Sequence, residues 1–213
     1  MSNAGLRAAL RWPDLPPPYN GALHAALDFI LERAGADRIL AIYATGSVVR
    51  GEGGPHSDLD VFVVHDNPWR QRVQRRFGGV PVELFFNPPH RVRRTFEEER
   101  KRRRPAAAHM IATGFPVYKS GPEAATLRAG AQAVVDAGPP AVDADEANRA
   151  RYLAVTLLED GEDAAARDPA ASLLLLARAV DVAVRYRYAV AGRWEPRDAE
   201  VVGCLAGPDP ELR

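Results

Sequence analysis

The chain has 213 residues, of which 46% are hydrophobic and 26% are charged, and its formal net charge is zero. This composition is that of a globular protein able to bury a core, in one large domain or two small ones. The single cysteine, Cys204, excludes an intramolecular disulfide. The longest mainly apolar stretch, 170–180, is too short to span a bilayer, and no apolar leader opens the chain. We therefore expect a cytoplasmic protein without membrane contact.

The charge is unevenly distributed along the chain. Residues 70–104 contain twelve Lys or Arg and four Asp or Glu, an excess of eight positive charges, so the remainder carries eight negative ones. A concentrated basic segment favours an anionic partner such as a nucleotide or RNA. For the run 97–104 a solvated helix face is the alternative. The many arginines and alanines hint at a bacterial source.

The first third of the chain alternates apolar runs with Gly and Pro. The Pro-rich residues 1–18 predict an irregular arm. Apolar residues at helical spacing then predict a helix over 20–34 that ends at Gly35. An apolar run at 38–43 predicts the first strand, and residues 47–50 are expected to start a short helix.

Further strands and helices follow from the same signals. Runs at 72–77 and 80–86 around Gly78-Gly79 predict a β-hairpin, after a strand at 59–64. A charged helix is expected from Pro89 to about 104, interrupted by Pro105, with a piece ending at Gly114. A strand at 115–118 and a helix at 123–137 complete this part.

Beyond Gly138-Pro139-Pro140 the composition changes to one that favours helices. Asp143 resembles the cap of a capping box, and a helix should run from it to about 159. Asp168-Pro169 predicts a second helix ending at Gly192, and a third begins near Pro196. We expect an irregular arm (1–18), an α+β domain with a small mixed sheet flanked by helices (19–138), and a C-terminal helical bundle (143–213). The chain ends soon after Pro208-Asp209-Pro210, so this bundle is expected to be truncated.

Three acids stand in or beside apolar strands, where acids are unfavourable. Asp58 and Asp60 are two residues apart and so face one side, with Leu59 and Val61 on the other, while Glu83 sits on a later strand. Clustered carboxylates repel each other unless they are protonated or bound to cations. Hard oxygen ligands suit Mg²⁺ or Mn²⁺, and two such ions about 3.5–4 Å apart can support phosphoryl transfer.

A Gly-Ser turn precedes these acids. Gly46 permits close backbone approach, and backbone amides with the Ser47 hydroxyl can hold a phosphate tail. Arg50 and Lys119 are candidates for further phosphate contacts, although solvated surface charge is the alternative for each.

Gly46-Ser47, a ten-residue spacer, Asp58-Leu59-Asp60 and Glu83 together resemble the DNA polymerase beta-like nucleotidyltransferase superfamily. The form of the motif is similar to that of the minimal and the aminoglycoside nucleotidyltransferases, some of which carry a HEPN-type helical bundle. The resemblance implies transfer of a nucleoside monophosphate from an NTP, such as ATP, to an acceptor hydroxyl with release of pyrophosphate. It implies that Asp58 and Asp60 bind two metal ions, that Glu83 binds the catalytic one, and that Gly46 and Ser47 hold the triphosphate.

The acceptor stays open at this point. The basic segment favours RNA or protein, and a small molecule of the aminoglycoside kind is the alternative. A nucleotide-binding or antitoxin-type module without turnover is the third possibility. The helical tail is expected to be HEPN-like in shape only, and a homodimer through it is a further expectation. The sequence identifies neither the NTP nor the general base.

Overall fold

The computed structural model describes residues 2–201 and 203, and the chain divides into two compact units. Unit 1 comprises Met1–Glu99 and Pro105–Ala137, and unit 2 comprises Arg100–Arg104 and the chain from Gly138. The expectations that rest on Cys204 and on Pro208-Asp209-Pro210 concern residues outside the described part. Within that part, no helix combines the length and apolar character needed to cross a bilayer.

Unit 1 is built on a five-stranded mixed sheet, so the expected α+β class is confirmed. The strands are ordered β3-β4-β2-β1-β5, with β2 parallel to β4 and every other pair antiparallel. The predicted hairpin is present, because Gly78 and Gly79 both have positive φ angles, as a two-residue turn between twisted strands requires. The strands are β1 (Ile39–Thr45), β2 (Leu59–His65), β3 (Gln71–Phe77), β4 (Val80–Asn87) and β5 (Phe115–Lys119).

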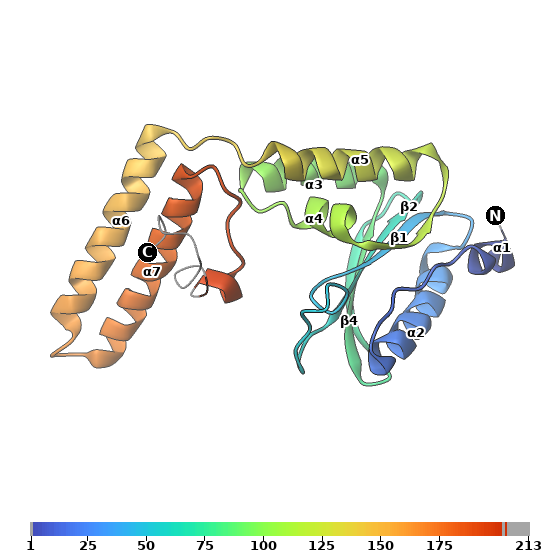
Figure 1. Ribbon diagram of the computed structural model, residues 1–213, viewed down its shortest axis with the longest axis horizontal. Coiled ribbons are helices and arrows are strands. Elements are labelled where there is room, and N and C mark those ends of the chain that lie inside the picture. Colours follow the sequence, from blue (N-terminus) through green and yellow to red (C-terminus); the bar gives the residue numbers. More distant parts are fainter. Residues whose placement is uncertain (1, 202, 204–213) are drawn as a thin grey trace. The chain divides into compact units, whose positions relative to one another are not determined.

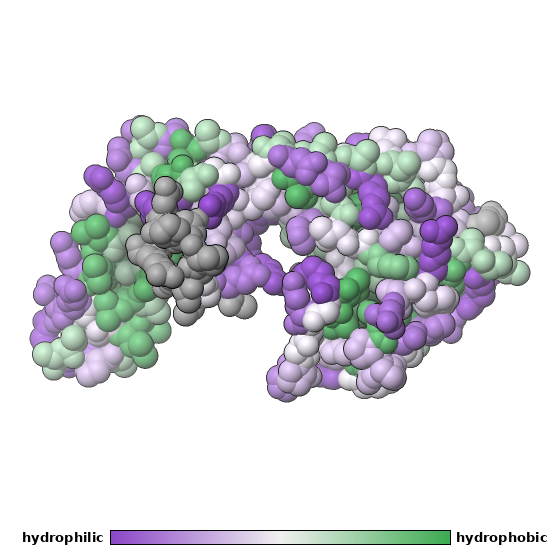
Figure 2. Space-filling view, viewed as in Figure 1, coloured by the Kyte–Doolittle hydropathy of each residue, from purple (hydrophilic) through white to green (hydrophobic). Residues whose placement is uncertain are grey.

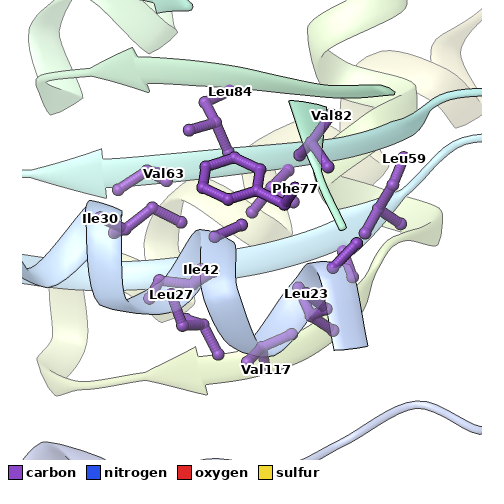
Figure 3. Packing of buried hydrophobic residues seen from close by; sticks show 14 of the residues in the cluster. Leu23, Leu27, Ile30, Ile42, Leu59, Val63, Phe77, Val82, Leu84 and Val117 are labelled. Carbon is purple, nitrogen blue, oxygen red and sulfur yellow. The ribbon is translucent and has the colours of Figure 1, made fainter. Parts of the chain in front are cut away.

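Helices cover both faces of this sheet (Figure 1). On one face, α2 packs Leu23, Leu27 and Ile30 against strand residues that include Ile42 and Leu84 (Figure 3). The other face is covered by three helices, whose buried residues pack against the alternate positions of β1 and β2. The helix α2 comprises Pro17–Ala34, and the three helices of the other face are α3 (Pro89–Lys101), α4 (Ala106–Thr113) and α5 (Gly121–Ala137). Both faces are therefore buried, which explains the nearly continuous apolar runs of the central strands.

The irregular arm predicted for residues 1–18 is wrong in two places. A short helix, α1 (Asn3–Ala8), begins after Ser2, whose hydroxyl accepts a hydrogen bond from the N–H of Gly5 at 3.2 Å. Leu6 on this helix is fully buried in the core of unit 1. The helix α2 begins at Pro17 rather than near residue 20, since a proline in the first turn loses no helical hydrogen bond.

The connection after β1 also differs from expectation. The strand continues to Thr45, and the short helix expected at 47–50 is a turn. Gly46 and Gly51 bracket this turn with φ angles of +92° and +77°, outside the helical region. The Arg50 N–H donates to the Gly46 carbonyl at 3.3 Å, so the segment forms a turn and not a regular helix.

Unit 2 is centred on a pair of packed helices, α6 (Ala144–Ala164) and α7 (Pro169–Val190), followed by a 3-10 turn, η1 (Asp198–Glu200). The predicted caps are confirmed: Asp143 and Asp168 accept backbone N–H bonds from Glu146 and Ala171 at 2.7 and 3.0 Å. The reciprocal half of the capping box is absent, because the Glu146 carboxylate binds Arg103 at 2.6 Å instead. The helix α6 runs to residue 164, past the predicted end near 159, and the third predicted helix begins as this 3-10 turn.

Candidate functional site

Four polar side chains form a row across the sheet at the end where β1 stops and β2 begins. Asp60 on β2 is paired in register with Thr45 on β1 and with Glu83 on β4. Glu83 is in turn opposite Gln74 on the edge strand β3. Residues in register on adjacent strands project to the same face, so this row lies on the sheet face that α3, α4 and α5 cover further along.

The three predicted acids converge here. Oxygen atoms of Asp58, Asp60 and Glu83 lie within 4.8 Å of one another. Asp58 immediately precedes β2 and is exposed, Asp60 is half-buried, and Glu83 is buried. Leu59 and Val61 point into the core on the opposite face, as the strand alternation predicts. The cluster is therefore open to solvent at one end and closed at the other.

Within the cluster, Asp60 has the shifted pKa. Burial, followed by the neighbouring carboxylates of Asp58 and Glu83, raises the pKa of its carboxyl from the usual value to about 7. The guanidinium groups of Arg72 and Arg50 act in the opposite direction. Three carboxylates so close together have fewer positive charges nearby than their full ionisation would require, so the cluster is a favourable place for a divalent cation.

Gly46 brings the backbone directly against Asp60. A Cβ atom at this position would lie 2.6 Å from Oδ2 of Asp60, and the φ angle of +92° is one that only glycine adopts without strain. The Gly-Ser turn and the acid pair are thus parts of one structure, with the turn lying over the carboxylate.

The loop between the turn and the acids is held by hydrogen bonds to Ser57. The Ser47 hydroxyl donates to Oγ of Ser57 at 3.3 Å, and this oxygen also accepts the N–H of Gly54 at 2.8 Å. The Tyr19 hydroxyl on α2 donates to the Ser57 carbonyl at 3.0 Å. These bonds place Ser47 beside Asp58, which follows Ser57 in the chain.

Two residues that the sequence analysis did not select contact Glu83. Arg72 donates from Nε to the Glu83 carboxylate, and Gln74 donates to the same oxygen at 3.2 Å. The Arg72 guanidinium also lies over the Phe85 ring, 5.3 Å from its centre. The signal was present in the sequence, because a two-residue Gly78-Gly79 turn places Gln74 opposite Glu83.

Of the two further candidates, Arg50 lies near the acids and Lys119 does not. The Arg50 guanidinium lowers the pKa of Asp60 and pairs with Glu52 at 2.8 Å. Lys119 ends β5 opposite Ala41, four residues along β1 from Thr45. At about 3.3 Å per residue this offset is about 13 Å, so Lys119 stands apart from the cluster.

The basic segment 70–104 serves several purposes in the structure. Arg93 and Arg94 pair with Glu123 and Glu98 on the helices of unit 1. Arg103 is buried, with a φ angle of +56°, and its pair with Glu146 belongs to unit 2. Arg72, in contrast, remains largely exposed beside the acids. Only part of the predicted positive surface is therefore available to a partner.

The comparison with protein families agrees with the motif. Residues 25–109 match the family described as nucleotidyltransferase domain, a range that contains every residue of the acid cluster and of the turn. No curated protein matches the chain. Among solved structures, a nucleotidyltransferase-like protein from Exiguobacterium sibiricum matches 89% of this chain and 69% of its own, at 12% identity and a TM-score of 0.43.

Proposed function

Because residues 25–109 match the nucleotidyltransferase domain family, we propose that the protein transfers a nucleoside monophosphate from an NTP to an acceptor hydroxyl and releases pyrophosphate. The observation that carries this proposal is the approach of Asp58, Asp60 and Glu83 to within 4.8 Å beneath the Gly46 turn. These oxygens form a hard, anionic ligand set suited to Mg²⁺ or Mn²⁺.

Each residue of the cluster has a distinct task in this proposal. Asp58 and Asp60 hold two divalent ions, and Glu83 is the third ligand of the ion nearer the acceptor. When bound, the ions stabilise the charge on the attacking and leaving oxygens. The Ser47 hydroxyl and the backbone around Gly46 hold the triphosphate, and Arg50 adds a positive charge near it.

The position of Arg72 indicates which kind of acceptor the site favours. Its guanidinium contacts Glu83, the acid on the acceptor side of the proposed site, and Gln74 flanks it on the same strand face. Arg76, two residues further along that face, is exposed as well. A row of cationic and amide groups repels a polycationic aminoglycoside and attracts a phosphate backbone. We therefore place RNA first among the acceptors, with the Arg72 side chain on one of its phosphates.

Transfer from each of the four α-labelled NTPs, with Mg²⁺ or Mn²⁺, tests the proposal against tRNA, total RNA, protein and aminoglycosides. We expect label on RNA, and a loss of at least about a thousandfold in Asp58→Asn and Asp60→Asn, because each removes a metal ligand. Asp66→Asn is the matched control, since Asp66 is exposed and interacts with Arg38 away from the cluster. Retained transfer in Asp60→Asn excludes the metal-dependent mechanism.

The acceptor is tested separately with Arg72 and Arg75. We expect Arg72→Gln to raise the KM for RNA about tenfold and to flatten its salt dependence, since one phosphate contact is lost. Arg75→Gln removes the same charge from the opposite face of β3, where Arg75 lies over Phe29 and Phe77, and should change little. Label on aminoglycosides alone, or on protein alone, overturns the RNA assignment. If the protein binds NTP but transfers nothing to any acceptor, the proposed transferase activity is wrong and the protein is a nucleotide-binding module without turnover.

A further inference from the structure

The α6–α7 pair leaves large apolar side chains uncovered. Leu173 and Leu174 are 70% and 69% exposed, and Tyr152 on α6 is 74% exposed. Figure 2 shows apolar residues gathered over the helices of unit 2. An exposed apolar surface of this kind marks an interaction site in a soluble domain.

The inner face of α6 is already used by α7. Leu157 and Gly161 are buried, and the Gly161 carbonyl accepts a hydrogen bond from the Ser172 hydroxyl at 2.7 Å. A Cβ atom at Gly161 would lie 2.8 Å from a methyl group of Leu176, so the two helices are in close contact here. The outer face of α6 is a separate surface.

The outer face is centred on Val155. At 100° per residue, positions three, four and seven away from Val155 share its side of the helix. Tyr152 and Leu158 are three residues before and after it, and Arg151 and Glu159 are four residues before and after it. The three apolar side chains are 74%, 48% and 45% exposed in chain order. Within the described residues, the side chains of Arg151 and Glu159 form no hydrogen bond or ion pair.

This order of residues is self-complementary. When two copies of a helix lie antiparallel about a two-fold axis, a residue before the axis faces the one equally far after it. With the axis at Val155, Tyr152 faces Leu158 of the second copy and Arg151 faces Glu159. Each pairing occurs twice, and Val155 faces itself. A parallel pairing would instead place Arg151 against Arg151 and Glu159 against Glu159.

We propose that the outer face of α6 binds the same face of a second copy of this chain, antiparallel, with the two-fold axis at Val155. The occupant is a second copy because the charges and apolar groups complement themselves in this register. An apolar centre flanked by opposite charges is the usual composition of an isologous interface. The inference concerns unit 2 alone and does not depend on the proposed function.

Charge reversal on the full chain tests the register. Sedimentation velocity over 1–100 µM should show the wild type dimerising. Arg151→Glu and Glu159→Arg should each weaken dimerisation at least about tenfold, because each places like charges opposite one another twice. An equimolar mixture of the two variants should recover the wild-type affinity as a heterodimer, since every charge then faces its opposite. Arg149→Glu changes the same charge on another side of α6 and should have no effect.

A cysteine at the axis gives a second, independent readout. In a Cys204→Ser background, Val155→Cys should form a covalent dimer with a short bismaleimide, whereas Asp160→Cys, on the opposite side of α6, should not. Circular dichroism checks that each variant keeps its helices. A wild type that stays monomeric at 100 µM, single reversals that dimerise like the wild type, or a mixture that fails to recover the affinity each overturns the proposal.

Discussion

The sheet of unit 1 and the helix pair of unit 2 contain similar apolar residues but differ in how much of their apolar surface is buried. The sheet is enclosed by helices on both faces, and its central strands are almost entirely buried. Within the described part of unit 2, the buried hydrophobic residues are Leu157, Ala179, Val184 and Val201. Of the nine exposed large hydrophobic residues in the whole described part of the chain, eight lie on α6 and α7. Two helices form one contact surface, and their remaining faces need another partner, whereas a sheet with two helical layers buries both of its own.

Two leucine truncations, one on a helix of each unit, test this difference in burial with the largest expected effect. Leu27 on α2 is 1% exposed, so Leu27→Ala should cost about 3 kcal/mol of unfolding free energy through lost burial and a cavity. Leu174→Ala should cost less than about 0.5 kcal/mol, because Leu174 is 69% exposed. Urea unfolding at 1 µM protein measures both. Equal losses would contradict the view that the helix pair has an open face.

The next prediction concerns the contact between the Gly-Ser turn and the acids. Gly46→Ala should lower nucleotidyl transfer at least about a hundredfold, because the added methyl displaces the Asp60 carboxylate and 1 Å misplacements cost about that much. Gly51→Ala is the matched control: its φ of +77° is similarly strained, but nothing lies within 4 Å of the added Cβ. Comparable transfer by the two variants would show that backbone strain, rather than the contact, matters.

His65 gives unit 1 a pH-dependent stability. The side chain is fully buried, accepts the Asn67 N–H at Nδ1 and lies 4.3 Å from the Trp69 ring. Burial lowers the pKa of His65 to about 4, so the unfolded chain takes up its proton first as the pH falls. Stability is therefore full above about pH 6.5 and is lost between that value and about 4.

We expect His65 to lower the free energy of unfolding by about 2 kcal/mol when the pH falls from 7.5 to 4.5. His65→Gln should remove that part of the pH dependence, since glutamine does not titrate there and can still accept the Asn67 hydrogen bond. Urea unfolding of both proteins at the two pH values measures the difference. Parallel pH profiles would show that other groups carry the acid sensitivity.

The smallest expected effect separates the two cationic candidates. Arg50→Gln should raise the KM for NTP about fivefold, because the loss of one partly exposed charge near the phosphates costs about 1 kcal/mol. Lys119→Gln should leave transfer unchanged, as Lys119 stands opposite Ala41 at the other end of β1. Steady-state kinetics over a range of NTP concentrations measures both, and a matching rise in the Lys119 variant would argue against the placement of the site.

Local signals in the sequence predicted much of the fold. The Gly78-Gly79 hairpin and the caps at Asp143 and Asp168 appear as expected, because each depends on one or two residues whose backbone chemistry is specific. The break at Pro105 begins earlier than expected, since α3 ends at Lys101 rather than near residue 104. The helix at residues 3–8 was missed, since its reason for forming is the burial of Leu6 against residues distant in sequence. The sequence likewise places Arg103 in a run of charged residues, where a solvent-exposed side chain is expected. In the structure its side chain is buried and donates a hydrogen bond to Glu146.

The sequence by itself indicated that three acids belong together, because clustered carboxylates repel one another unless they are protonated or bound to cations, and the resemblance of the motif added the Gly-Ser turn. Only the tertiary structure decided how close they come, that Gly46 lies against Asp60, and that Arg72 and Gln74 complete the group around Glu83. It also decided that the outer face of α6 is uncovered. The physical reason is the same in each case: spacing along a chain specifies which side of an element a residue occupies, whereas strand order and helix packing specify what that side meets.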